Sequence, residues 1–264
     1  MTIIYPSPIF GPVHSRRLGI SLGINLQPAD GKVCTFDCIY CECGLNASHP
    51  ANMKRPSRME VSQALEKKLQ EMINNATVPD VLTFAGNGEP TGHPDFYNII
   101  IDTIALRDRY CPLAKVSVLS NATMCGKPEV REALLMVDNN ILKLDTVSAE
   151  YIRNVDRPVS SAYDVREVIS WLKDYKGHCI IQTMFMTGKG EIEDEGMTLC
   201  VDNTSEEYVN PWLDALKDIA PKQVMIYTID RETPVRWLQK ASAEQLDGIA
   251  EKVRALGIPC SVSY

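Results

Sequence analysis

The sequence predicts an α/β protein with the architecture of a partial (β/α)6 TIM-like barrel, formed as one domain by residues 1–264. Short apolar segments that suit strands alternate along the chain with amphipathic segments that suit helices, and this alternation is typical of βα units on a parallel sheet. No linker or low-complexity segment interrupts the alternation. A chain of 264 residues is also long enough to bury one large core.

The first predicted strand is Gly19–Leu26, and Ser57-Arg-Met-Glu60 then has the spacing of a capping box that opens a helix. One face of this helix is apolar and is expected to lie in the core; its residues are Val61, Leu65, Leu69, Met72 and Ile73. The further predicted strands are Val81–Phe84, Lys115–Leu119, Asn140–Leu144, Cys179–Met186, Gln223–Thr228 and Pro259–Ser263. The further predicted helices are Phe96–Arg107, Pro128–Met136, Tyr163–Trp171, Thr204–Ile219 with a second capping box at its start, and Ser242–Leu256.

Charge and composition narrow the classes of function. The net charge of −7 and the isoelectric point near 5.2 disfavour a general nucleic-acid-binding surface, because affinity for a polyanion depends on many Lys and Arg contacts to phosphates. No apolar run reaches the roughly 20 residues that cross a bilayer, and the first residues lack the features of a signal peptide. Nine cysteines, an odd number, fit reduced thiols and a metal site better than a disulfide framework. We therefore expect a cytoplasmic protein without a membrane segment.

The stretch Cys34-Thr-Phe-Asp-Cys38-Ile-Tyr-Cys41 directly follows the first predicted strand. Three thiols within eight residues indicate a metal site. Three ligands leave one coordination position open, and in a cubane [4Fe–4S] cluster they leave one iron free. The alternative is a structural zinc site that adds Cys43 as the fourth ligand; otherwise Cys43 is a spare thiol, a repair ligand or a bystander.

The C-x3-C-x2-C spacing, with the aromatic Tyr40 before the last cysteine, resembles the motif of the radical S-adenosylmethionine (SAM) superfamily. This resemblance implies a [4Fe–4S] cluster held by Cys34, Cys38 and Cys41, whose free iron chelates SAM. It also implies that one electron, from a reductant such as flavodoxin or ferredoxin, cleaves SAM to a 5′-deoxyadenosyl radical that abstracts hydrogen from a substrate. The subclass, oxidoreductase, lyase or transferase, stays open.

Reactive groups of α/β barrels lie after the carboxyl ends of the strands. After the second predicted strand, Asn87-Gly88-Glu89-Pro90 resembles the Gly-Gly-Glu element of the family, with Asn87 in place of the first glycine. The resemblance implies that Glu89 and the exposed backbone receive the SAM ammonium. After the third strand, Ser120 and Asn121 match a turn that faces the SAM carboxylate or ribose in relatives; an ordinary polar loop is the alternative.

The later strands carry the other residues that the resemblance assigns to SAM. Lys143 and Asp145 bracket the end of the fourth strand, as partners of ribose and carboxylate or as an ion pair at the barrel rim. The residues expected to lie against adenine are Tyr40, Tyr227 and Ile229, through their backbone, and Met184, for which ordinary packing in the core is the alternative.

The runs that start at Phe10-Gly-Pro-Val-His, Gly86-Asn-Gly-Glu-Pro and Val224-Met-Ile-Tyr resemble iron–sulfur oxidoreductases grouped with wyosine-type tRNA synthases. Those synthases carry cysteines ahead of the triad and an added recognition domain, whereas no cysteine precedes Cys34. We therefore expect an unidentified small or partly exposed substrate. The alternatives are modification of a tRNA base and a non-catalytic iron–sulfur protein.

Two further features have a possible chemical role. Cys200, in the acidic connection after the fifth strand, would donate a hydrogen atom to a substrate radical or ligate an auxiliary cluster. Arg16 and Arg17 would clamp a substrate phosphate, since guanidinium groups bind phosphate through paired hydrogen bonds. Ordinary surface positions and ion pairs are the alternatives.

Overall fold

The structure is a computed structural model that describes residues 2–15, 19–192 and 196–264. It divides into two compact units. The amino-terminal unit comprises Ile4–Thr35 and Asn46–Ile141, and the carboxyl-terminal unit comprises the chain up to Ile3, Phe36–Leu45 and Leu142–Tyr264. The single domain over residues 1–264 stays a prediction. Arg16, Arg17 and the acidic residues 193–195 lie outside the described residues, so the phosphate clamp also stays a prediction.

The sheet of the amino-terminal unit contains, in spatial order, β1 (Ile9–Ser15), β2 (Gly19–Ile24), β3 (Val81–Phe84) and β4 (Lys115–Ser120). β1 is antiparallel to β2, whereas β2, β3 and β4 are parallel to one another. All four residues of β3 are buried, as expected for a parallel strand that is covered on both faces. Sequence reasoning missed β1, because Gly11 and Pro12 interrupt its pattern and its pairing shifts register between Phe10 and Val13.

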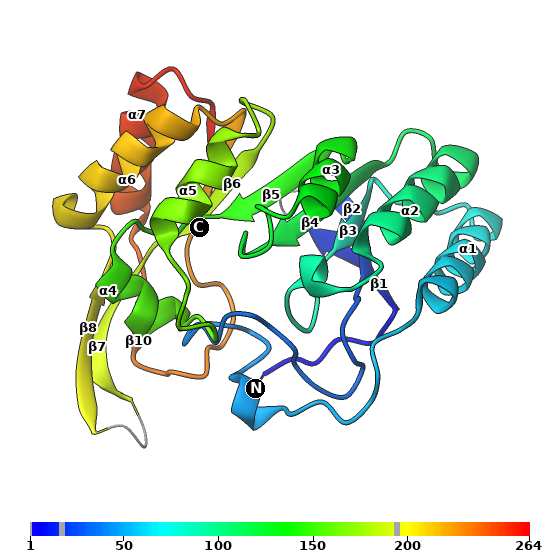
Figure 1. The fold of residues 1–264 in the computed structure, drawn as a ribbon, viewed down its shortest axis with the longest axis horizontal. Coiled ribbons are helices and arrows are strands. Elements are labelled where there is room, and N and C mark those ends of the chain that lie inside the picture. The colour runs from blue at the N-terminus through cyan, green and yellow to red at the C-terminus, as the bar shows by residue number, and fades with distance from the viewer. Residues whose placement is uncertain (1, 16–18, 193–195) are drawn as a thin grey trace. The chain divides into compact units, whose positions relative to one another are not determined.

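The helices of this unit are α1 (Arg58–Asn74), α2 (Phe96–Tyr110) and α3 (Pro128–Met136), and α2 packs against both of the others (Figure 1). Short 3₁₀ turns, η1 (Asn46–Ser48) and η2 (Pro90–Gly92), lie in its loops. The predicted capping box at Ser57 and Glu60 is confirmed. The expected burial of Ile73 is wrong: it is 40% exposed, because it lies at the edge of the apolar face that Val61, Leu65, Leu69 and Met72 form.

In the carboxyl-terminal unit, β6 (Ile180–Met184), β9 (Gln223–Tyr227) and β11 (Cys260–Ser263) are parallel, with β9 in the middle. The helices are α4 (Ala149–Tyr151), α5 (Val165–Lys173), α6 (Glu206–Ile219) and α7 (Ala243–Ala255), and α6 packs against both α5 and α7 (Figure 1). The fully buried Trp212 of α6 packs edge-on against Phe185. The chain passes from one unit to the other within β5 (Asn139–Lys143).

A second sheet in this unit contains β10 (Leu238–Lys240), β7 (Met186–Ile192) and β8 (Met197–Asp202), in that order and all antiparallel. The predicted strand Cys179–Met186 is therefore wrong at its end, since β6 stops at Met184 and β7 begins at Met186. The side chain of Asn203 explains the break, because its amide donates to the Met184 carbonyl (2.8 Å) and its oxygen accepts from the Met186 N–H (2.9 Å).

The predicted capping box at Thr204 is also wrong. Ser205 is the N-cap of α6, and its side chain makes no capping hydrogen bond. The Thr204 hydroxyl instead donates to Oδ1 of Asp202 (2.6 Å), the last residue of β8. Among the described residues, no helix is long and apolar enough to span a membrane.

The two serine N-caps give a matched test of stability. Ser242 caps α7 in a full capping box with Gln245, whereas Ser205 makes no side-chain bond to α6. We expect Ser242→Ala to lower the free energy of unfolding by about 1 kcal/mol, because a backbone donor loses its partner. Ser205→Ala should change it by less than about 0.5 kcal/mol. Urea denaturation followed by circular dichroism measures both values, and equal losses would contradict the capping assignment.

Candidate functional site

The backbone just before Cys34 is anchored to the Gly-Asn-Gly-Glu element within the amino-terminal unit. The Val33 N–H donates to the Asn87 carbonyl (2.9 Å), and the Glu89 N–H donates to the Val33 carbonyl (3.3 Å). Gly88 has a φ of +138°, and a Cβ there would lie 1.9 Å from the Val33 oxygen. Only glycine allows this approach, so the element determines where the chain enters the cysteine loop.

Glu89 connects the ends of β3 and β4. Its buried carboxylate accepts four hydrogen bonds: from Thr91 N (3.0 Å), Thr91 Oγ1 (2.5 Å), Ser120 Oγ (2.8 Å) and Asn121 N (2.7 Å). Burial raises the pKa of Glu89, and these donors partly oppose that rise. The carboxylate therefore already has a structural role, and its contact with a SAM ammonium stays a prediction.

Asn87 holds the chain through its side chain, which is fully buried. Its amide donates to the carbonyls of Tyr5 and Pro28 (2.8 Å each), and its oxygen accepts from the Tyr5 N–H (2.7 Å). These bonds occupy both ends of the side chain, so the geometry does not support a ligand contact through it. Pro90 is buried at the start of η2.

The turn after β4 contacts the first motif cysteine. Asn121 Nδ2 lies 3.6 Å from Cys34 Sγ and donates to Thr35 Oγ1 (2.8 Å). Thr123 completes the group, since its hydroxyl lies 2.7 Å from Thr35 Oγ1. The predicted site residues Ser120 and Asn121 are thus brought together with Glu89 and Cys34.

In the carboxyl-terminal unit, a π-helical turn, η3 (Ile152–Asp156), holds the rest of the cysteine loop. The Asp37 N–H donates to the carbonyls of Asp156 (3.1 Å) and Arg157 (3.0 Å), and the Ile39 N–H donates to the Val155 carbonyl (3.0 Å). π-Helical turns are rare and occur frequently at functional sites. Sequence reasoning missed this turn, because a single π turn has no periodic pattern.

Beside this turn lies a buried polar network of Tyr40, Lys143, Asp145 and Asp156, here called the Lys143 network. The Lys143 ammonium lies 2.5 Å from Asp156 Oδ1, 3.4 Å from Asp145 Oδ2 and 3.4 Å from Cys38 Sγ. The Tyr40 hydroxyl donates to both carboxylates, at 3.1 Å to Asp156 Oδ1. The structure therefore brings three predicted site residues together with a motif cysteine and with Asp156, which was not predicted.

The protonation of the network follows from its burial and charges. Burial lowers the pKa of Lys143, but the two carboxylates raise it by more, so its pKa lies well above the ordinary value and the group is an ammonium. Burial raises the pKa of Asp156 to about 6, which is still below neutral pH. Burial and then the nearby carboxylates raise the pKa of Tyr40, which stays a neutral donor. The Lys143 ammonium thus faces two buried carboxyl groups.

The residues predicted to lie against adenine surround Tyr40. The Met184 N–H donates to Asp145 Oδ1 (2.9 Å), and the Met184 side chain packs on the apolar cluster that contains Tyr40 and Ile229. Tyr227 ends β9 opposite Met184, and it is one of the groups that raise the pKa of Tyr40. Their contacts with SAM stay predictions. Tyr151 packs in the same cluster, and its buried hydroxyl has no hydrogen-bond partner among the described residues.

Cys200 lies on β8 between Leu199 and Val201, which pack in the cluster that contains Tyr40. Since side chains alternate along a strand, Cys200 points to the opposite face, where it is exposed. Its catalytic role stays a prediction. The three motif cysteines are half-buried, whereas Cys43 is buried. No group of three His, Cys, Asp or Glu side chains in the described part of the chain converges as ligands of a single ion.

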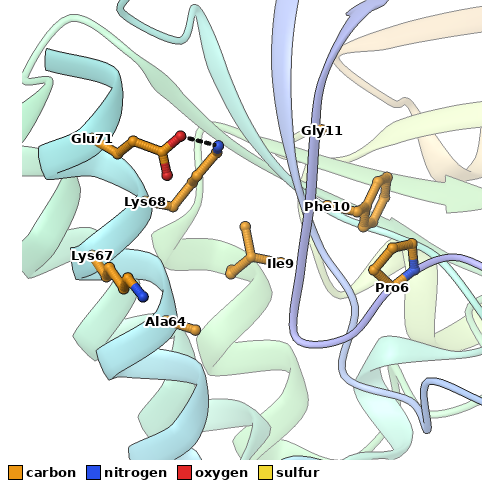
Figure 2. A pocket seen from close by; sticks show the side chains of 8 residues that line it. All are labelled: Pro6, Ile9, Phe10, Gly11, Ala64, Lys67, Lys68 and Glu71. Carbon is orange, nitrogen blue, oxygen red and sulfur yellow. Dashed lines mark hydrogen bonds and ion pairs between the residues drawn. The ribbon is translucent and has the colours of Figure 1, made fainter. Parts of the chain in front are cut away.

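A separate hollow of about 360 Å³ lies between β1 and α1 in the amino-terminal unit (Figure 2). Its lining combines apolar side chains with an ion pair between Lys68 and Glu71 (2.9 Å). None of the predicted site residues lines it.

Sequence reasoning missed Asp156 and Asn203, which both connect predicted site residues. Asp156 ends η3, whose single π turn has no periodic pattern, and Asn203 lies in the connection between β8 and α6. The usable signal for Asp156 was its place in the connection after β5, because polar groups at strand ends are site candidates. Asn203 follows the acidic hairpin, and nothing in the sequence indicates that its side chain reaches back to Met184 and Met186.

Gly88 and Gly92 test the anchoring of the cysteine loop as a matched pair. A Cβ at Gly88 would collide with Val33, whereas a Cβ at Gly92 would meet no atom within 4 Å. We expect Gly88→Ala to lower the free energy of unfolding by about 1–3 kcal/mol, because the backbone is strained. The variant should also bind less iron per chain after reconstitution. Gly92→Ala should change stability by less than about 0.5 kcal/mol and leave iron binding unchanged. Denaturation midpoints and iron assays measure both; normal iron binding by Gly88→Ala would contradict the anchoring.

Three comparisons relate this chain to known proteins. A UPF0026 protein of Helicobacter pylori is 31% identical over 241 residues, which cover 90% of this chain and 71% of that protein. A radical SAM methyltransferase structure from Sphaerobacter thermophilus has a TM-score of 0.66 at 15% identity and covers 92% of this chain, which spans 66% of that one. A structure of TYW1 with a lysine–pyruvate adduct bound has a TM-score of 0.61 at 12% identity and covers 89% of this chain and 73% of that one.

The two solved structures share the fold of this chain, which confirms the predicted partial barrel of the radical SAM type. In sequence, the family model of the radical SAM superfamily matches residues 30–200, more than half of the chain, and this segment includes Cys34, Cys38 and Cys41. The predicted family and its cofactors, a [4Fe–4S] cluster and SAM, are confirmed by this match. The chain therefore belongs to the radical SAM superfamily.

Proposed function

We propose that this radical SAM enzyme holds its [4Fe–4S] cluster through Cys34, Cys38 and Cys41 and abstracts hydrogen from a small or partly exposed substrate. The observation that carries the proposal is the state of the cysteine loop. Backbone hydrogen bonds anchor it at Val33, just before Cys34, and at Asp37 and Ile39, on either side of Cys38, and its three cysteines are half-buried. Cys200 and Cys260 are also accessible, but they lie outside this loop. Three accessible thiols, each next to an anchored stretch of backbone, suit a cluster that keeps one iron free.

When bound, the cluster and SAM would supply the one-electron chemistry that removes a hydrogen atom from the substrate. A reductant of the flavodoxin or ferredoxin class would supply the electron. The residues of this chain orient and stabilise the cysteines that would hold the cluster. Asn121 and Lys143 direct N–H groups at the sulfurs of Cys34 and Cys38, and Glu89 fixes the turn that carries Asn121.

The charge of the Lys143 network supports SAM as the ligand. Asp145 and Asp156 outnumber Lys143, and all three are shielded from water. Buried acidic side chains favour a cationic ligand, because electrostatic attraction is stronger where the dielectric is low. SAM carries a sulfonium and an ammonium. The contacts that we propose for it involve Ser120, Asn121, Met184, Tyr227 and Ile229.

A second candidate substrate is a tRNA base, and the fold likeness to TYW1 motivates it. The net charge of −7 argues against it, because RNA binding depends on positive charge. The half-buried cysteine loop and the network beside it also favour an enzyme over a passive iron–sulfur protein. A reducing compartment such as the cytoplasm suits the nine cysteines, and this location stays a prediction.

Cleavage of SAM is the direct test. The protein is reconstituted anaerobically with iron and sulfide and given dithionite and SAM, and 5′-deoxyadenosine is measured by mass spectrometry. We expect product from the natural chain and a loss of at least about tenfold in Cys38→Ala, because one iron loses its ligand. Cys260→Ala is the matched control, since Cys260 is also half-buried but lies outside the motif.

The outcomes separate the alternatives. Product that persists in Cys38→Ala would contradict the ligand assignment. A cluster that forms but neither cleaves SAM nor changes its electron paramagnetic resonance (EPR) signal when SAM is added would identify a passive iron–sulfur protein.

A further inference from the structure

We infer that Lys143 is a positioning residue for the iron–sulfur cluster, and that its ammonium, held against Cys38 Sγ, makes the cluster easier to reduce. This inference rests on the proposed function, because it requires Cys38 to be a cluster ligand. It differs from the sequence expectation, which assigned Lys143 to the ribose or carboxylate of SAM.

The contacts of the ammonium support this role. The Lys143 ammonium donates to Asp156 Oδ1 at 2.5 Å and to Cys38 Sγ at 3.4 Å, and it forms an ion pair with Asp145 Oδ2 at 3.4 Å. The Lys143 side chain is only 15% exposed, so water screens these contacts weakly. An ion pair at the barrel rim would need only the carboxylates, whereas here the ammonium also donates to the sulfur of Cys38.

The cysteine loop itself encloses the ammonium. Phe36 and Tyr40, two residues before and two residues after Cys38, present their rings to Lys143 Nζ at centroid distances of 4.8 and 4.9 Å. Both distances lie within the range of cation–π attraction. The loop is also bonded to η3, which supplies Asp156. Cys38, its two aromatic neighbours and Asp156 thus hold the charge of Lys143 at one place.

The electrostatic consequence has a definite sign. Reduction adds one negative charge to a cluster whose three thiolates are already negative. A cation beside a ligand sulfur stabilises the reduced form more than the oxidised form, and hydrogen bonds to sulfur act in the same direction. Lys143 therefore shifts the midpoint potential to less negative values. Asp156 opposes it, because its carboxylate neutralises part of the charge of the ammonium.

These opposite effects define the experiment. Reconstituted full-length variants are poised at a series of potentials, and the reduced cluster is quantified by EPR, with iron and sulfide measured per chain. We expect Lys143→Met to shift the midpoint to more negative values, Lys143→Arg to restore most of the shift, and Asp156→Asn to shift it to less negative values. Lys173→Met is the matched control, because Lys173 pairs with Asp218 at 3.3 Å on the surface, and its midpoint should be unchanged.

Lys143→Met removes the cation that faces two buried carboxyl groups, and such a variant can fail to fold. In that case the Asp156 variant still tests the inference. Asp156→Asn preserves shape and removes a charge, so a shift opposite to that of lysine loss cannot come from general loosening of the loop. Midpoints that are identical in the natural chain, Lys143→Met and Asp156→Asn would overturn the inference while leaving the proposed function intact. A natural chain that forms no [4Fe–4S] cluster would instead overturn the proposed function.

Discussion

The anchoring of the cysteine loop is the constraint on which the rest of the site depends. An irregular loop has no ladder of its own, so its backbone groups need partners from elsewhere. Val33 takes its partners from the Gly-Asn-Gly-Glu element, and Asp37 and Ile39 take theirs from η3. The close approach of Gly88 to Val33 and the π-helical geometry of η3 are both unusual backbone features, and both serve this loop.

Several residues at positions that resemble ligand-binding positions of the superfamily form hydrogen bonds within the protein itself. Asn87 ties Tyr5 to Pro28, and Glu89 joins the ends of β3 and β4 through four hydrogen bonds. Buried polar groups without partners are costly, so these internal bonds are what allow a carboxylate and an amide at this depth. A motif read as a binding element is therefore also a folding element, and a substitution in it affects both roles.

The Lys143 network shows the same principle with charges. A lysine and two aspartates are buried together because each contact offsets the loss of water, and the Tyr40 hydroxyl supplies a further donor. The network links η3, the end of β5 and the cysteine loop. Membership of the radical SAM superfamily gives this arrangement its chemical meaning, since the sulfur that the ammonium contacts belongs to the cysteine motif.

Local chemistry in the sequence determined the cysteine motif, the capping box at Ser57 and most strands, because spacing and apolar periodicity act over a few residues. It also indicated the family. Only the tertiary structure decided that Asp156 joins Lys143, that Asn203 breaks the strand at Phe185, and that Cys200 faces away from Tyr40. Each of these depends on contacts between segments that are distant in the chain or on the register of a hairpin, and neither leaves a local pattern in the sequence.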